Sequence, residues 1–221
     1  MTATTLFLVR HGQTAWHRAN RYAGRADLEL DATGRAQAAK LAGWAATAAL
    51  SGVVSSPLRR AVQTARPAAA AASLALECDD RLRELDFGRA EGLRLADLRS
   101  NDPDAVRRFE DDPAAHPLPG GEDPVAAAAR GRDCLLEVAA AHPGGSVLVV
   151  GHNTLLRLAL CELLGVALRD YRRRFGQVLN GALTEIELGA SGAALRRYNA
   201  PVTDGRSAPG PAGAGATIPS R

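Results

Sequence analysis

Two short apolar runs constrain the fold of this 221-residue chain more than any other feature. One is TLFLV at residues 5–9, and the other is VLVV within residues 146–151. Neither run alternates apolar and polar side chains, so each is typical of a strand that is buried on both faces. Strands of this kind belong to sheets that helices cover on both sides.

Helical patterns alternate with these runs along the chain. Residues 31–50 are rich in alanine, and Asp31 or Thr33 is the expected N-cap of a helix there. A further helix is expected from about Pro57 towards Pro67, with the preceding serine as its cap. Strands are expected at 5–9, 52–56, 146–151, 183–188 and 194–198, with helices through 125–138 and after residue 152. The order predicts a three-layer α/β/α fold with a mostly parallel central sheet.

Composition fits a single globular domain, which we expect over residues 1–200. Hydrophobic residues make up 46% and charged residues 23% of the chain. Residues 201–221 are rich in proline, glycine and alanine and are expected to form a flexible tail. The 27 basic residues exceed the 24 acidic ones only slightly and are scattered among them, so nucleic-acid binding is not expected.

Cysteine content and the N-terminus indicate the compartment. Cys78, Cys134 and Cys161 are odd in number, far apart and without a CxxC pair, so we expect them to be reduced and buried. The first apolar run is too short for a signal peptide, and no run is long enough to span a membrane. We therefore expect a cytoplasmic protein without membrane association.

Two of the expected strands lead into histidines. Residues 5–9 run into Arg10-His11-Gly12, and the strand at 146–151 runs into His152. Ligands of α/β sheets bind beyond the carboxyl ends of the strands, so the two imidazoles are expected to face each other there. Arg59 and Arg60 begin the next helix, whose N-terminus attracts anions. The implied ligand is negatively charged, and phosphoryl transfer to a neutral imidazole suits this set of side chains.

Six motifs occur in order over residues 6–164: LVRHGQTAW, LDATGRAQA, SSPLRRAVQTA, RELDFGRAEG, PGGE and VVGHNTLLR. Together they resemble the histidine phosphatase superfamily, also called phosphoglycerate-mutase-like. The resemblance implies a phosphomonoester hydrolase that forms a phosphohistidine intermediate and needs neither metal nor cofactor. The expected partner is a small-molecule phosphate ester, and a homodimer is left open.

The resemblance also assigns roles to individual residues. It makes His11 the nucleophile and Glu84 the general acid and base, while His152 joins Arg10 and Arg60 around the phosphoryl group. In Ser-x-Leu-x-Arg-Ala the arginine before alanine is the pocket residue, which favours Arg60 over a solvated Arg59. The substrate-binding residues that the resemblance implies are Arg10, Arg60, His17, Gly24 and Asn153.

One position departs from the family pattern. His17 stands where Arg-His-Gly-x-x-x-Trp-Asn has an asparagine that contacts phosphate, and an imidazole donates one hydrogen bond with a different reach. His17 is therefore a candidate phosphate contact, and Gly12 is expected to let the backbone come close.

Other polar residues carry weaker signals. Glu122 fits the mouth of a pocket or a helix cap, and Arg157 fits either the site or an ion pair. His116 and His142 precede prolines in expected loops and are read as solvent-facing, and residues 172–174 as a solvated basic patch.

Two other functions compete with hydrolysis. The sequences ELDFG and GHNT differ from Glu-Arg-His-Tyr-Gly and Ala-His-Gly-Asn, which are typical of phosphoglycerate mutases in this superfamily, and resemble its phosphatase branch. Similarity to alpha-ribazole phosphatases extends over ELDFGRAEG and RYAGRADLEL. A cofactor-dependent phosphoglycerate mutase is the first alternative, and a non-catalytic protein that binds phosphate esters is the second.

Overall fold

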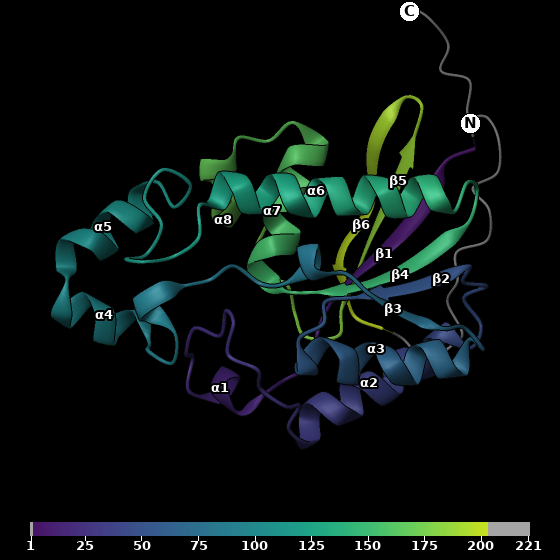
Figure 1. The fold of residues 1–221 in the computed structure, drawn as a ribbon, viewed down its shortest axis with the longest axis horizontal. Helices are drawn as coiled ribbons and strands as arrows, with labels where there is room; N and C mark the ends of the chain where they lie inside the picture. Colours follow the sequence, from purple (N-terminus) through teal and green to yellow (C-terminus); the bar gives the residue numbers. More distant parts are fainter. Residues whose placement is uncertain (1, 203–221) are drawn as a thin grey trace, which may run out of the picture.

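The computed structural model describes residues 2–202, so most of the expected tail at 201–221 lies outside the described residues. A six-stranded sheet with the order β3-β2-β4-β1-β5-β6 forms the middle layer (Figure 1). Its strands are β1 (Thr4–Arg10), β2 (Gly52–Ser55), β3 (Leu76–Cys78), β4 (Ser146–Gly151), β5 (Leu183–Gly189) and β6 (Gly192–Ala200). Strands β3, β2, β4 and β1 are parallel, whereas β5 and β6 are antiparallel to their neighbours.

Helices cover both faces of this sheet. They are α1 (Ala15–Arg18), α2 (Ala32–Ala45), α3 (Arg59–Ala71), α4 (Leu95–Asn101), α5 (Pro103–Asp111), α6 (Pro124–Ala141), α7 (Asn153–Leu164) and α8 (Tyr171–Arg174). Helices α6 and α7 lie on one face and α2 and α3 on the other, while α1, α4 and α5 lie beyond the carboxyl ends of the parallel strands (Figure 1). The predicted three-layer α/β/α fold is confirmed.

The hydrophobic core has two parts, one on each side of the sheet. In β1, Leu6 and Leu8 join the cluster beneath α6 and α7, whereas Phe7 and Val9 pack with the cluster beneath α2 and α3. Strand β4 divides its side chains in the same way. Because side chains of a strand alternate between faces, a strand buried on both sides must be apolar throughout. This explains the two apolar runs in the sequence.

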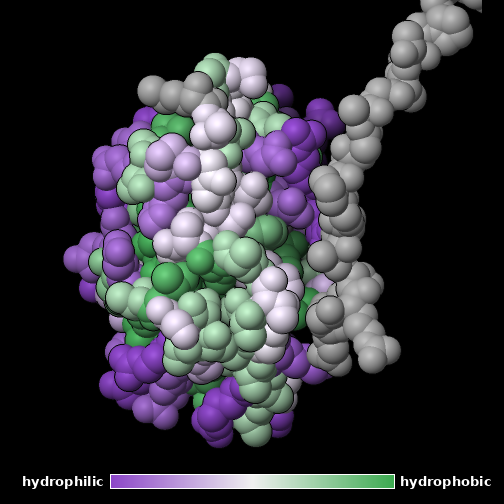
Figure 2. Space-filling model, turned by 90° about the vertical axis from the view of Figure 1, so that its right-hand side faces the viewer, coloured by the Kyte–Doolittle hydropathy of each residue, from purple (hydrophilic) through white to green (hydrophobic). Residues whose placement is uncertain are grey.

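On the face of the molecule that is turned away from α4 and α5, hydrophobic and hydrophilic residues occupy separate areas. Hydrophobic residues gather across the middle of this face, and hydrophilic residues dominate above and below (Figure 2). No helix within residues 2–202 combines the length and apolar character that crossing a bilayer requires.

Helix α3 differs from its prediction at both ends. It begins at Arg59 rather than Pro57, and no side chain of its own segment caps it. Instead Asp27 accepts a hydrogen bond of 2.7 Å from the Arg59 amide. The helix continues through Pro67 to Ala71, because Ala68 and Ala69 are buried in the core and their packing outweighs the one hydrogen bond that the proline removes.

Shorter features were also missed. Strand β3 and helices α1 and α8 have three or four residues each, too few for periodicity to reveal. The expectation of three buried cysteines is wrong for Cys78, which is exposed because β3 is the edge strand of the sheet. Cys134 and Cys161 are buried as expected.

Candidate active site

The two histidines meet where β1 and β4 end. These strands are parallel neighbours, with Arg10 paired to Gly151, so the residues that follow each strand emerge side by side. The rings of His11 and His152 lie 5.0 Å apart between centroids. Both side chains are buried. The expected juxtaposition of the two imidazoles is therefore present.

His11 is held in one tautomer by its neighbours. Its Nδ1 lies 2.7 Å from the carbonyl oxygen of Gly12, which can only accept, so Nδ1 carries the proton. Nε2 is therefore unprotonated, and its lone pair accepts a hydrogen bond of 3.2 Å from Arg60 Nε. Burial, followed by the proximity of His152 and the charge of Arg60, holds the pKa of His11 well below its usual range. The ring is thus neutral.

Gly12 allows a close approach of a different kind from the one expected. A Cβ atom at this position would lie 2.6 Å from the carbonyl oxygen of Gly34 in the first turn of α2. The amide of Gly12 also donates to Thr64 Oγ1 at 2.9 Å. Glycine here lets the loop after β1 pack directly on α2 and α3, which fixes the position of the preceding histidine.

Arg60 is fully buried beside His11. Its terminal nitrogens donate to three backbone carbonyl oxygens, those of Ala23, Gly24 and Ala26, at 2.6–2.9 Å. Gly24 does not itself line the cavity described below; it contributes the carbonyl that orients Arg60. Arg59 points away and pairs with surface acids, as the motif indicates.

Arg10 lies on the other side of His11. One of its terminal nitrogens donates to the Val178 carbonyl at 2.7 Å, and the other lies 2.8 Å from His17 Nε2. Its Nε is buried and has no hydrogen-bond partner within residues 2–202. Burial lowers the pKa of Arg10 to about 10, so the guanidinium remains charged at neutral pH. A buried, charged donor without a partner is suited to an anionic ligand.

His17 supports Arg10. Because a guanidinium only donates, Arg10 donates to His17 Nε2. His17 Nδ1 lies 3.0 Å from the Thr14 amide, which donates to it, and 2.9 Å from Thr14 Oγ1. Burial, and then the charge of Arg10, lower the pKa of His17 to about 4. In this arrangement Nε2 has no proton to give to phosphate, and the side chain orients Arg10.

His152 completes the cluster. Its Nε2 lies 2.8 Å from Ser56 Oγ at the end of β2, and its Nδ1 is buried without a hydrogen-bond partner in the described part of the chain. Burial, followed by the charges of Arg60 and Arg10, holds the pKa of His152 well below its usual range. The imidazole is therefore neutral.

Residues 177–181, between α8 and β5, close the site over the strand ends. Asn180 donates to the His11 carbonyl at 2.7 Å, and the Gly181 amide donates to the Arg10 carbonyl at 2.8 Å. Asn153 accepts a 3.0 Å hydrogen bond from the Val178 amide. Sequence reasoning missed this segment; its signal was the Asn-Gly pair, which marks a turn before a strand.

Glu84 is held at the N-terminus of α7. Its carboxylate accepts hydrogen bonds from the amides of Leu85, Thr154 and Leu155 at 2.9–3.0 Å. The side chain is buried, and it lines the same cavity as His11. The free amides of a helix N-terminus orient carboxylates in this way.

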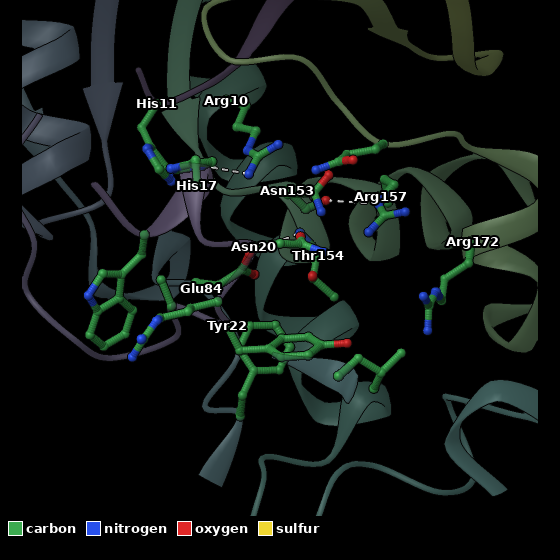
Figure 3. Close-up of a pocket in the computed structure, with 16 residues that line it drawn as sticks. Arg10, His11, His17, Asn20, Tyr22, Glu84, Asn153, Thr154, Arg157 and Arg172 are labelled. Carbon is green, nitrogen blue, oxygen red and sulfur yellow. Dashed lines mark hydrogen bonds between the residues drawn. The ribbon is translucent and has the colours of Figure 1, made fainter. Parts of the chain in front are cut away.

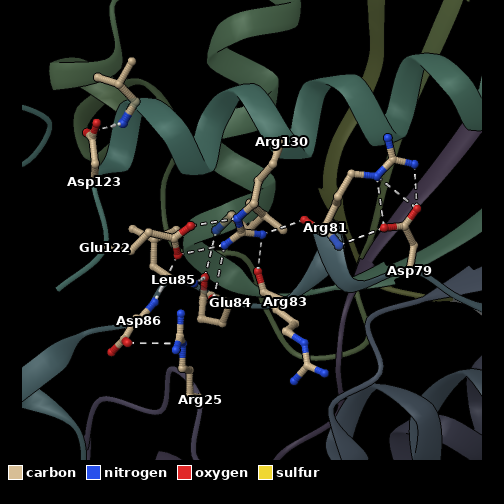
Figure 4. A network of polar contacts seen from close by, with 12 residues as sticks. Arg25, Asp79, Arg81, Arg83, Glu84, Leu85, Asp86, Glu122, Asp123 and Arg130 are labelled. Carbon is tan, nitrogen blue, oxygen red and sulfur yellow. Dashed lines mark hydrogen bonds and ion pairs between the residues drawn. The ribbon is translucent and has the colours of Figure 1, made fainter.

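Arg130, on α6, fixes the backbone around Glu84 (Figure 4). One of its terminal nitrogens donates to the carbonyls of Arg81 and Arg83 at 2.6 and 2.8 Å. Its charge is paired with Glu122 through two contacts of 2.8 and 2.9 Å. Glu122 therefore neither lines the pocket nor caps α6, which is capped by Asp123.

A cavity of about 350 Å³ lies in front of these residues (Figure 3). Its volume falls near the lower limit for small-molecule sites. Arg157 lines the cavity. Of the two roles expected for this residue, the structure therefore supports a place in the site and not an ion pair. Arg172 lines the cavity too, while it remains exposed to solvent, as expected for residues 172–174. The other lining residues are Arg10, His11, Trp16, His17, Asn20, Arg21, Tyr22, Ala23, Glu84, Phe87, Leu95, Asn153, Thr154 and Gln177.

Metal ligands are not grouped in this part of the molecule. Across residues 2–202, no three histidine, cysteine, aspartate or glutamate side chains lie together in a geometry that could hold a metal ion.

The buried histidines should make the fold acid-labile. His11, His17 and His152 have lowered pKa values, so the unfolded chain takes up protons below about pH 6.5 that the folded protein does not. Stability is then full above that pH and falls below it, by about 1 kcal/mol per histidine between pH 7.5 and 5.5. Urea unfolding at the two pH values measures this loss.

His17→Asn provides the matched variant for that measurement. It removes one of the three titrating groups and keeps a polar side chain, so its stability should fall by about 1 kcal/mol less than that of the wild type over the same pH interval. An equal loss in both proteins would contradict the assignment of a lowered pKa to His17.

The fold and the site together define an α/β protein with a buried histidine and arginine site for an anion at the carboxyl ends of its parallel strands. The family model of the histidine phosphatase superfamily (branch 1) matches residues 6–201, and the chain belongs to that family.

Individual relatives agree with this assignment. Phosphoserine phosphatase 1 of Hydrogenobacter thermophilus is 34% identical over 166 residues, which cover 75% of this chain and 79% of that protein. The solved structure of a mycobacterial glucosyl-3-phosphoglycerate phosphatase matches with a TM-score of 0.82 at 30% identity, covering 90% of this chain and 99% of that one.

Longer relatives also match. A bifunctional protein of Mycobacterium tuberculosis is 43% identical over 176 residues, which cover 76% of this chain and 47% of that protein. The chain therefore spans about half the length of the first of the curated relatives it matches.

Proposed function

We propose that this protein hydrolyses small phosphate monoesters through a phosphohistidine intermediate. The observation that carries the proposal is the state of His11, whose unprotonated Nε2 is buried beside the Arg60 guanidinium, in a ring that lines the cavity together with Arg10. A neutral imidazole attacks phosphorus, and Arg10 and Arg60 supply charge that matches the phosphate oxygens. The relatives named as phosphatases support the same reaction.

In the first step, the His11 Nε2 lone pair forms a bond to phosphorus and the ester P–O bond breaks. Glu84 gives a proton to the departing oxygen, so the product leaves as a neutral alcohol. Arg10 Nε, which has no partner among the described residues, donates to the phosphoryl group. His152 does the same through Nδ1 when the Ser56 hydroxyl donates to its Nε2.

In the second step, water attacks phosphohistidine. Glu84, now ionised, accepts a proton from that water as the new O–P bond forms and the N–P bond breaks. Inorganic phosphate leaves, His11 returns to its neutral form, and Glu84 is protonated again for the next substrate. Its three backbone hydrogen bonds keep the carboxylate in place for both steps.

We also infer that the protein is cytoplasmic and that its reaction requires no metal and no cofactor. Hydrolysis is preferred over mutase chemistry because the sequences around Glu84 and His152 resemble the phosphatase branch. A mutase would have to retain its phosphohistidine until the phosphoryl group returned to the substrate, whereas a hydrolase admits water.

The proposal predicts hydrolysis of p-nitrophenyl phosphate in the presence of EDTA. Release of p-nitrophenolate is followed by absorbance, and the phosphoenzyme is trapped by an alkaline quench, which preserves phosphohistidine. We expect turnover to be unchanged after prolonged dialysis against the chelator. Activity that disappears with EDTA and returns with a divalent cation would contradict the mechanism.

A second assay separates the alternatives. ³¹P NMR of 3-phosphoglycerate with a trace of 2,3-bisphosphoglycerate shows inorganic phosphate for a hydrolase and 2-phosphoglycerate for a mutase. Binding of phosphate esters without either product would identify a non-catalytic binding protein.

A further inference from the structure

We propose that the cavity holds a second anion subsite, formed by Arg157 and Arg172, and that the substrate carries a second anionic group at the end remote from its phosphate. The inference rests on the proposed function for the identity of the first subsite. Figure 3 shows Arg10, His11 and His17 on one side of the cavity, Arg172 on the opposite side, and Arg157 between them in this view.

Arg157 is a buried cation without an acidic partner. Its side chain is 7% exposed, and its Nε donates to the Asn153 carbonyl at 3.0 Å. Its guanidinium lies over the ring of Tyr171, 4.8 Å from the centroid. It makes no ion pair with any residue from 2 to 202. Burial of a charge is costly unless something compensates it, so an anion from outside the chain is expected.

Arg172 approaches the same space from α8. Its guanidinium lies 5.1 Å from the centroid of the Phe109 ring, and no carboxylate within the described residues pairs with it. The neighbouring Arg173 behaves differently, because it points outward and pairs with Asp170 at 2.8 Å. Burial lowers the pKa of Arg157, and its side chain and that of Arg172 line the same cavity.

The charges around the cavity exceed what one phosphate needs. Four arginines line it and Arg60 lies behind His11, whereas Glu84 is the acid among the lining residues. His11 and His17 are neutral. A phosphate monoester brings at most two negative charges, which Arg10 and Arg60 meet. The fourth lining arginine, Arg21, is exposed and donates to the Gly92 carbonyl, so Arg157 and Arg172 remain for a further anion.

The space between the two subsites suits a short organic skeleton. Tyr22 and Phe87, whose rings lie 4.9 Å apart between centroids, line it together with Leu95. At about 350 Å³ the cavity admits a phosphate ester of a few carbon atoms. A guanidinium fork matches either a carboxylate or a phosphate, so the shared chemistry is a second anion.

Matched substrate pairs test the subsite. 3-Phosphoglycerate and glycerol 3-phosphate differ by a carboxylate in place of a hydroxymethyl group, and fructose 1,6-bisphosphate and fructose 6-phosphate differ by a second phosphate. In at least one of the two pairs, we expect the wild type to favour the member that carries an anionic group at each end. The expected preference is about 10-fold or more in kcat/KM. Arg172→Gln, at an exposed position, should remove most of that preference through KM, and Arg157→Gln should act in the same way.

Arg173→Gln is the matched control, since it removes the same charge one residue away and its side chain is 75% exposed. It should leave the preference within about twofold of the wild type. A wild type that hydrolyses both members of each pair equally well would overturn the subsite. So would an Arg172→Gln variant that retains the full preference, or one that slows both members of a pair to the same degree.

Binding measurements separate the subsite from the reaction. Calorimetry on His11→Ala, with and without Arg172→Gln, compares the affinities for 3-phosphoglycerate and glycerol 3-phosphate in proteins lacking the proposed nucleophile. Suppose that the wild type hydrolyses no ester, but the two affinities of His11→Ala differ and the added Arg172→Gln substitution makes them equal. In that case the subsite is supported and the proposed function is wrong. Equal affinities for both esters in His11→Ala would overturn the subsite whatever the catalytic result.

Discussion

Replacement of His11 by alanine is expected to lower kcat/KM for p-nitrophenyl phosphate by at least about 1000-fold. The reason is that Nε2 of this ring is the atom that bonds to phosphorus in the proposed mechanism, and alanine has no group that can replace it. The alkaline-stable phosphoenzyme should disappear together with the turnover. Steady-state absorbance and the alkaline quench measure the two effects.

His116→Ala is the control for this variant, because His116 is an exposed histidine in the loop after α5. It should retain the activity of the wild type. Circular dichroism of His11→Ala should show the native spectrum, so that a loss of activity reports on chemistry. Retention of a phosphoenzyme in His11→Ala would disprove the assignment of the nucleophile.

Glu84→Gln is expected to separate the two halves of the reaction. With an alkyl phosphate, the leaving oxygen needs a proton that glutamine cannot supply, and kcat should fall by about 100-fold or more. With p-nitrophenyl phosphate, the leaving group departs without a proton, so phosphorylation continues while hydrolysis of phosphohistidine is slow. Stopped-flow absorbance should then show a burst approaching one p-nitrophenolate per active site, followed by slow turnover.

The substitution also has a structural cost. A glutamine amide group cannot accept from the Thr154 amide, which removes one hydrogen bond worth about 1 kcal/mol. Glu29→Gln, a charge loss at an exposed surface position paired with Arg59, is the control and should behave as the wild type. If Glu84→Gln slowed both substrates equally and gave no burst, the carboxylate would have only a structural role.

Much of the site was accessible from the sequence because it depends on the ends of strands. Once residues 5–9 and 146–151 are recognised as buried parallel strands, His11 and His152 must lie at the same edge of the sheet. The position of Arg60 before alanine in the Ser-x-Leu-x-Arg-Ala motif distinguished it from Arg59, and the structure places Arg60 beside His11 and Arg59 at the surface. The family that these motifs indicated is confirmed.

The errors have a common cause. Asp27 caps α3 from outside its own segment, and the run of three arginines at 172–174 does not show that Arg172 lines a cavity. Segment 177–181 joins β1 to α7 through Val178 and Asn180. Each of these features depends on contacts between residues that are tens of positions apart in the chain, or on the direction in which one turn of a helix faces. Local sequence patterns reveal neither.

The sequence by itself determined the layers of the fold and the residue types that meet at the strand ends, because the period of side chains along a strand and the apolar character of its two faces are local properties. Only the tertiary structure decided the state of those residues. Burial and long-range contacts make His11 and His17 neutral, orient each imidazole ring, and leave Arg157 and Arg172 facing the cavity without acidic partners among the described residues. These properties follow from the dielectric surroundings and the arrangement of distant charges, which exist only once the chain has folded.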